Sequence, residues 1–129
     1  AEAVAALADL ESVGQQIVDI EKKKDDPDPS YRVRPEITRL EAKAMLAEFD
    51  GDLTEAEHLI DQAVALEETL PIAFGPPVID KPTHELLGEF LLRRGRKSEA
   101  QDAFKKAVAR TPGRRLAVQG LAASSDSKP

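Results

Sequence analysis

Small residues and one proline stand at fixed intervals across residues 81–114, and this spacing constrains the fold more than any other feature of the chain. Gly88 and Ala100 are small at the points where the two helices of a hairpin would cross. Phe104 is the bulky side chain that would fill the space beside them. Pro112 would end the second helix, because it lacks an N–H group and its ring clashes with the preceding turn. The pattern therefore predicts two antiparallel helices in close contact.

This segment resembles the tetratricopeptide repeat, a helix-turn-helix unit of about 34 residues. The residues that match the repeat pattern are Leu87, Gly88, Ala100, Phe104, Ala107 and Pro112. The chain is similar to the C-terminal repeat region of bacterial-type tetratricopeptide proteins. The resemblance implies an all-α fold of antiparallel helix-turn-helix repeats, which stack into a superhelical solenoid. It also implies a protein-binding or scaffold function without catalysis.

A second copy of the pattern lies 44 residues upstream. The aligned pairs are small or apolar: Ala44 with Gly88, Ala56 with Ala100, Ile60 with Phe104, and Ala63 with Ala107. Because 44 residues exceed one repeat period by about ten, an insertion must separate the copies. The Pro-rich run at 71–80 is the stretch that can hold it. Its apolar side chains are expected either to dock on the domain's own helices, which the stiffness of the prolines favours, or to meet a partner.

The pattern along the whole chain predicts a single all-α domain over residues 1–123, with about two repeats and flanking helices. Its expected parts are a leading helix (1–24), a degenerate repeat (36–70), the Pro-rich insertion (71–80), the better repeat (81–114) and a capping helix (115–123). Residues 124–129 are expected to form a disordered tail. Because repeat arrays normally need about three units, we interpret the leading helix as the remnant of a preceding repeat in a longer protein.

The leading helix is amphipathic. Its apolar residues recur at intervals of three and four, which predicts one face of a helix. They are Val4, Leu7, Leu10, Val13, Ile17 and Ile20.

Charge is distributed unevenly within the net charge of −6. Residues 36–70 carry ten acidic and two basic side chains, whereas residues 71–129 carry six acidic and eleven basic ones. Opposite charges in two halves of one chain predict either internal complementarity or association of two molecules, and a homodimer is one expected outcome. The alternative is that both halves are solvated faces without a role.

The sequence offers little catalytic chemistry. Without cysteine, thiolate metal sites and cysteine nucleophiles are excluded. The His-Glu pair at 84–85 begins like a zincin motif, but Gly88 stands where the second histidine should be. His84 is therefore expected to be a packed core residue. His58 lies one turn from Glu55 and from Asp61, and we interpret this group as a solvated helix face rather than a metal site. No cofactor is expected.

Nucleic-acid and membrane binding are also disfavoured. The basic cluster of residues 93–97 has no interleaved aromatic side chains, and aromatic residues make up only 4% of the chain, so stacking platforms for bases are missing. No apolar run approaches the roughly 18 residues of a membrane span. The compartment stays open, with the cytoplasm favoured.

The resemblance implies a concave groove lined by the first helix of each repeat. The residues expected there are Glu41, Met45 and Glu48 from the upstream repeat and Glu85, Glu89, Leu92 and Arg93 from the downstream repeat. Such a groove would be mostly acidic with apolar spots, which favours a basic or amphipathic peptide or protein as the partner. Two alternatives stay open: the face is covered by further repeats of the same protein, or the chain is an accessory or regulatory region of a larger enzyme.

The proposed helix crossing can be tested with Ala100. Ala100→Leu forces extra volume into a close-packed contact and should cost roughly 1–3 kcal/mol of unfolding free energy. Ala109→Leu, at an exposed position of the same helix, should be nearly silent. Equal urea unfolding midpoints for the two variants would contradict the alignment of the repeat.

Overall fold

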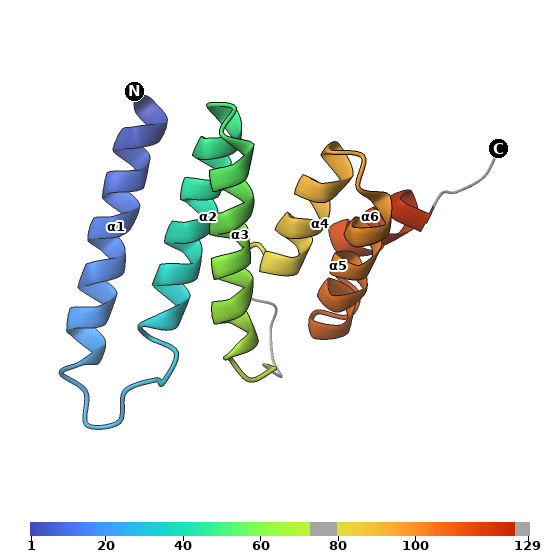
Figure 1. Cartoon of the computed structure of the whole chain (residues 1–129). Coiled ribbons are helices and arrows are strands. Elements are labelled where there is room, and N and C mark those ends of the chain that lie inside the picture. The colour runs from blue at the N-terminus through green and yellow to red at the C-terminus, as the bar shows by residue number, and fades with distance from the viewer. Residues whose placement is uncertain (73–79, 126–129) are drawn as a thin grey trace. The chain divides into compact units, whose positions relative to one another are not determined.

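The computed structural model of the chain describes residues 1–72 and 80–125, and over these residues its regular elements are all α-helices (Figure 1). The six helices of this part are α1 (Glu2–Glu21), α2 (Val33–Phe49), α3 (Leu53–Glu68), α4 (Thr83–Arg93), α5 (Lys97–Arg110) and α6 (Arg115–Ser125). Helices that follow one another within a unit pack together, which is compatible with a helical repeat arrangement. The predicted all-α fold is confirmed.

The chain divides into two compact units, an N-terminal unit of Ala1–Leu70 and a C-terminal unit of Pro71–Pro129. Most of the insertion predicted at 71–80 falls on residues 73–79, which lie outside the described residues, as do residues 126–129 of the predicted tail. The predicted single domain at 1–123 stays a prediction.

The last helix is longer than predicted. α6 continues to Ser125, so the first two residues of the expected tail are helical. Ser124 is buried, and its hydroxyl donates a hydrogen bond of 2.9 Å to the Leu121 carbonyl. Polar composition alone therefore placed the helix end two residues too early.

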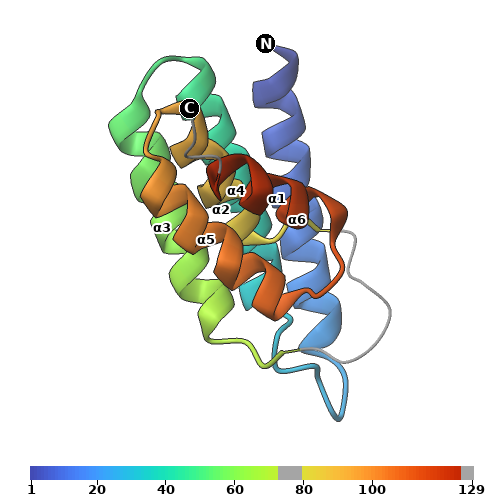
Figure 2. The ribbon, with the colours of Figure 1, turned by 90° about the vertical axis from the view of Figure 1, so that its right-hand side faces the viewer.

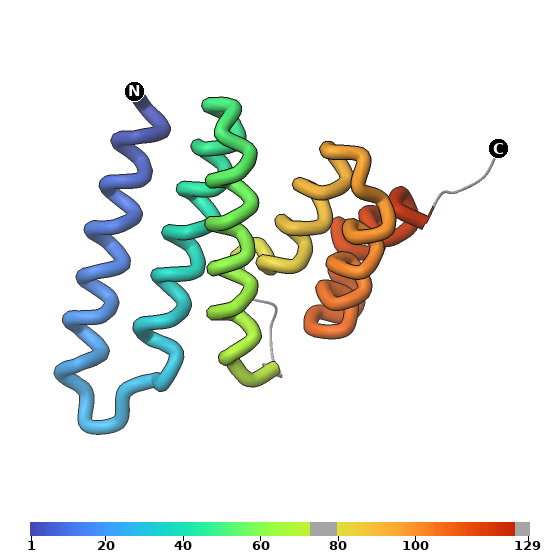
Figure 3. The backbone as a smooth tube through the Cα atoms, viewed as in Figure 1, coloured from blue at the N-terminus to red at the C-terminus, as the bar shows by residue number. Residues whose placement is uncertain are grey.

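The same turn closes both helical hairpins, α2–α3 and α4–α5, as the tube in Figure 3 lets the reader follow. Gly51 (φ 84°) and Gly95 (φ 74°) both occupy the left-handed region, which glycine enters without steric cost. After α4, the amides of Gly95 and Arg96 donate to the carbonyls of Leu92 and Leu91, both at 3.0 Å. This is the Schellman pattern of helix termination, and it recurs after α2 at 3.1 and 2.9 Å. Residues 44 positions apart in the two hairpins therefore form equivalent backbone hydrogen bonds.

Each unit has a core at the predicted small residues. In the N-terminal unit the buried apolar residues are Ile37, Leu40 and Ala44 of α2 and Ala56, Leu59, Ile60 and Ala63 of α3. In the C-terminal unit they are Leu86, Phe90, Leu91, Ala100, Ala103, Phe104, Ala107 and Ala117. Leu87 is only half-buried, and Pro112 lies exposed just beyond the end of α5.

Phe104 is the centre of the C-terminal unit. Its side chain is fully buried. α6 packs against both α4 and α5 (Figure 2). A Cβ atom on Gly88 of α4 would lie 2.8 Å from Phe104 Cε1, and one on Gly120 of α6 would lie 2.2 Å from the same atom. Both glycines therefore leave the space that the ring occupies. The contact of Gly88 matches the predicted crossing, whereas Gly120 was not predicted.

Gly120→Ala tests this packing against helix propensity. Alanine is better than glycine in a helix interior by about 1 kcal/mol, but overpacking a core costs about 1–3 kcal/mol. We expect a net loss of unfolding free energy, measured by urea denaturation. In a Phe104→Leu background the same substitution should cost less, because a smaller, more adaptable side chain relieves the clash. A stabilising effect of Gly120→Ala in the natural background would contradict the close contact.

Candidate functional site

An apolar stripe runs along α1 and is exposed. It consists of Ala3, Ala6, Leu10, Val13, Ile17 and Ile20, which we call the α1 stripe. The intervals between them alternate between three and four residues, the spacing of a helix–helix seam. The exposed fractions are 50% for Val13, 42% for Ile17 and 60% for Ile20. α1, all of which the structure describes, contains no buried residue along its 20 positions.

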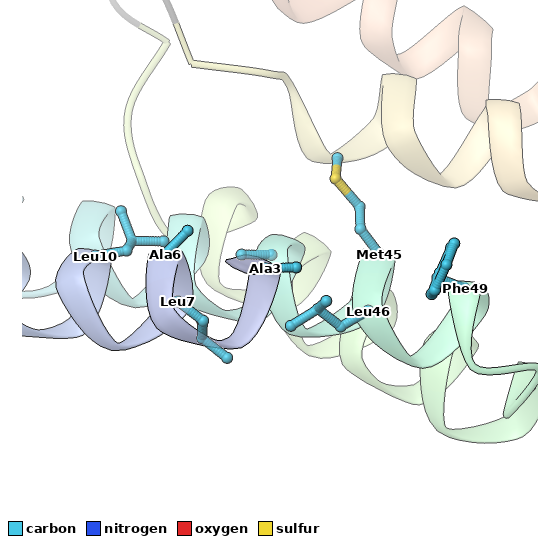
Figure 4. Close-up of a pocket in the computed structure, with 8 residues that line it drawn as sticks. Ala3, Ala6, Leu7, Leu10, Met45, Leu46 and Phe49 are labelled. Carbon is cyan, nitrogen blue, oxygen red and sulfur yellow. The ribbon is translucent and has the colours of Figure 1, made fainter. Parts of the chain in front are cut away.

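The N-terminal half of the stripe opens into a hollow of about 530 Å³ between α1 and α2. All eight lining residues are apolar: Ala3, Ala6, Leu7, Leu10, Ala42, Met45, Leu46 and Phe49. Figure 4 shows Ala6, Leu10 and Met45 on one side of this helix pair and Leu7 and Leu46 on the other. Met45 is 45% exposed and Phe49 is 88% exposed. The stripe and the side of the hollow that carries Ala6, Leu10 and Met45 therefore form one apolar face, with Met45 as its contribution from α2.

The two long edges of the α1–α2 pair differ in chemistry. At one edge the Glu11 carboxylate lies 3.7 Å from both Arg39 Nη1 and Lys43 Nζ. Glu11 and Val13 are two residues apart, as are Lys43 and Met45, and two residues turn an α-helix by about 200°. The ion pairs and the apolar face therefore lie on opposite edges, so one edge is closed by charge and the other is open and apolar.

α1 approaches α2 closely at one point. A Cβ atom on Gly14 would lie 3.2 Å from Pro35 Cβ, so a larger residue at position 14 would require this contact to shift by a few tenths of an ångström. The hollow lies on the N-terminal side of this point, among residues of the first half of α1 and the second half of α2. In the described part of the N-terminal unit, α1 packs on α2 alone.

Glu85 does not line an exposed groove, and that prediction is wrong. Its side chain is fully buried, and its carboxylate accepts hydrogen bonds from Arg114 Nε at 2.6 Å and Nη2 at 3.2 Å and from Lys81 Nζ at 3.2 Å. Lys81 also reaches Glu89 at 2.9 Å. The hydrogen bonding to Glu85 is the main cause that raises the pKa of Arg114 above its ordinary value. A carboxylate can be buried when it is paired in this way, so Glu85 fixes the start of α6 to α4.

Glu41 is also buried, with 5% of its area exposed, and its predicted place on an exposed face is wrong. It directly follows Leu40 and precedes Ala44 by three residues, which sets it within the buried face of α2. Glu41 and Glu85 are 44 residues apart, so both hairpins bury an acid at the same repeat position. The remaining predicted groove residues keep some exposure: Met45, Glu48, Glu89, Leu92 and Arg93. They belong to two units, and the groove that would unite them stays a prediction.

The other sequence candidates have ordinary surroundings. His84 is buried, as predicted. His58 Nε2 lies 2.6 Å from Gln62 Nε2, and no group of three or more potential ligands that could hold a metal occurs among the described residues. In the basic cluster, the Arg94 guanidinium stacks 5.3 Å above the Phe90 ring, and Arg96 forms a bidentate pair with Glu99 at 2.9 and 2.6 Å.

No protein-family model, curated protein or solved structure matches this chain. The tetratricopeptide resemblance therefore stays a prediction. Over residues 1–72 and 80–125, none of the helices combines the length and apolar character that crossing a membrane requires.

The apolar face on α1 and α2 is the feature that the sequence interpretation missed. The apolar pattern of the leading helix was assigned to one face, whereas the structure directs Leu7 into the hollow and leaves Val13, Ile17 and Ile20 exposed. The signal was present in the sequence as two neighbouring series: the α1 stripe, and residues 7 and 14 on the side that faces α2. Two series are more than one neighbouring helix can cover.

The burial of Glu85 generates a stability prediction. Glu85→Gln removes the charge that satisfies Arg114 and Lys81 and should cost roughly 1.5–3 kcal/mol, the range for hydrogen bonds to charged groups. Glu89→Gln, one turn away and 30% exposed, should cost less than about 1 kcal/mol. Urea denaturation at neutral pH measures both. Equal losses of unfolding free energy in the two variants would show that the buried ion pairs of Glu85 contribute no more to stability than the partly exposed pair of Glu89.

Proposed function

We propose that this protein is a non-enzymatic interaction module, and that a helix of a partner protein docks on the α1 stripe and the adjoining hollow. The observation that carries the proposal is the exposed seam of α1. A large contiguous apolar surface is costly to leave in water, and on soluble proteins such surfaces commonly mark interaction sites. The proposal keeps the protein-binding function implied by the tetratricopeptide resemblance, but its site is the α1–α2 face instead of the concave groove.

The shape and chemistry of the face favour a helix over a small molecule. Small-molecule sites usually place a few polar groups among apolar ones to orient the ligand, whereas the lining of this hollow is apolar throughout. A furrow between two helices instead accepts the side-chain ridge of a third helix. Helix-in-groove recognition reads anchors at intervals of three, four and seven residues, and the α1 stripe offers such intervals over 18 positions from Ala3 to Ile20.

The C-terminal unit contains an internal precedent for this arrangement. There α6 packs against both helices of the α4–α5 hairpin, and Ala117 of α6 becomes fully buried. The α1–α2 pair has an apolar face of comparable kind and, within the described part of its unit, no third helix over it. A docked helix would bury Val13, Ile17 and Met45, as the packing of α6 on its hairpin buries Ala117.

Titration with a synthetic amphipathic helix tests the proposal. The probe carries Leu and Ile at alternating intervals of three and four over three heptads, with uncharged polar residues elsewhere. In a ¹⁵N-labelled sample of the whole chain, we expect shifts concentrated in α1 and in the second half of α2. Val13→Asp should weaken binding at least about tenfold, which corresponds to about 1.4 kcal/mol.

A matched control separates binding from folding. Val118→Asp places the same charge on α6 at a residue of similar exposure, 47% against 50% for Val13. Both variants should unfold at nearly the natural urea midpoint, because substitutions of exposed residues usually change stability by less than about 0.5 kcal/mol. Shifts elsewhere in the chain, or equal loss of binding in the two variants, would refute the site.

A further inference from the structure

We infer that the partner helix carries lysine or arginine beside its apolar seam. These basic residues lie on the flank of the seam that faces the outer side of the α1 stripe. This inference rests on the proposed function and names the partner's chemistry. Glu2 precedes Ala6 of the stripe by four positions, and Asp9 precedes Val13 of the stripe by four positions. Residues four apart are neighbours on a helix surface, so these carboxylates form an acidic row beside the stripe. Gln16 continues the row before Ile20 without charge.

The acidic row is available to a partner. Glu2 and Asp9 are exposed, and neither forms an ion pair or a side-chain hydrogen bond within the described part of the chain. Glu11, by contrast, lies on the opposite edge and is engaged by Arg39 and Lys43. The acids that can still select a partner by charge therefore stand on the same side of α1 as the apolar seam.

The row also argues against a second copy of this chain as the occupant. In an antiparallel pairing of two stripes centred on Val13, Asp9 of one copy lies beside the uncharged Gln16 of the other copy and gains no cationic partner there. In a parallel pairing the row would face Leu7 and Gly14, which are directed toward α2. Flanking charges set partner choice in paired helices, and these pairings leave the charge of Asp9 without a complementary partner. A partner with a basic flank meets neither obstacle.

Two synthetic helices with an identical apolar seam test the inference. One carries lysine at the flanking positions, the other glutamate, and fluorescence anisotropy measures their affinity for the whole chain. At low salt the lysine probe should bind roughly tenfold more tightly, because two attractive pairs replace two repulsive ones. At about 0.5 M salt the difference should shrink, since the screening length falls to a few ångströms.

Charge reversal on the protein provides the decisive comparison. The double variant Glu2→Lys with Asp9→Lys should reverse the preference in favour of the glutamate probe. The control double variant Glu55→Lys with Asp102→Lys changes the net charge equally at exposed positions on α3 and α5 and should leave the preference as it is.

The outcomes separate the two proposals. Reversal in the first double variant alone supports the basic flank. Equal binding of both probes, abolished by Val13→Asp, overturns the basic flank and leaves the helix-binding function standing. Failure of both probes to bind at any salt concentration overturns the helix-binding function itself. Self-association that Val13→Asp dissolves would identify a second copy as the occupant and overturn the inference.

Discussion

The C-terminal unit depends on one aromatic ring held between two glycines. Phe104 of α5 meets α4 at Gly88 and α6 at Gly120, and at each glycine a single methyl group would overlap the ring. Three helices therefore share one close-packed centre, to which the buried Glu85–Arg114 pair adds a polar link between α4 and the start of α6. In the N-terminal unit the equivalent positions hold Ile60 and Ala44, and both are buried. That core closes between α2 and α3, and α1 adds no buried residue to it.

Local geometry is what the sequence predicted well. Gly95 ends a helix in the left-handed region, and Ala100, Phe104 and Ala107 are fully buried, because the size of each residue reports directly on the space around it. Gly120 follows the same logic, but its function depends on a ring sixteen residues upstream that faces it only after α6 has folded back. A glycine near a chain end carries no local sign of such a neighbour.

The surroundings of charged residues were predicted less well than those of small residues. The repeat resemblance places Glu85 and Glu41 in an exposed groove along the first helix of each repeat, yet both are buried. The Arg114 that pairs with Glu85 lies 29 residues further along the chain, at the start of the last helix. Pairing over such a separation cannot be recognised from intervals within one helix. The hollow on α1 and α2 was missed for a related reason, since spacings of three and four fit either face of α1 until α2 is seen to cover one of them.

Counts of acidic and basic residues in each segment therefore overstate the negative charge that the surface presents to a partner. A carboxylate that is buried against a guanidinium presents little field outward, and an exposed carboxylate held by two cations is partly neutralised. Glu85 and Glu11 are examples of these two cases. Glu2 and Asp9 are neither buried nor neutralised in this way, and they lie beside an apolar seam. Burial of such a seam favours binding, but the hydrophobic effect is non-directional. Under the proposed function this separation gives the two kinds of residue different roles: the stripe would determine how tightly a helix is held, and the acidic row would determine which helix is held.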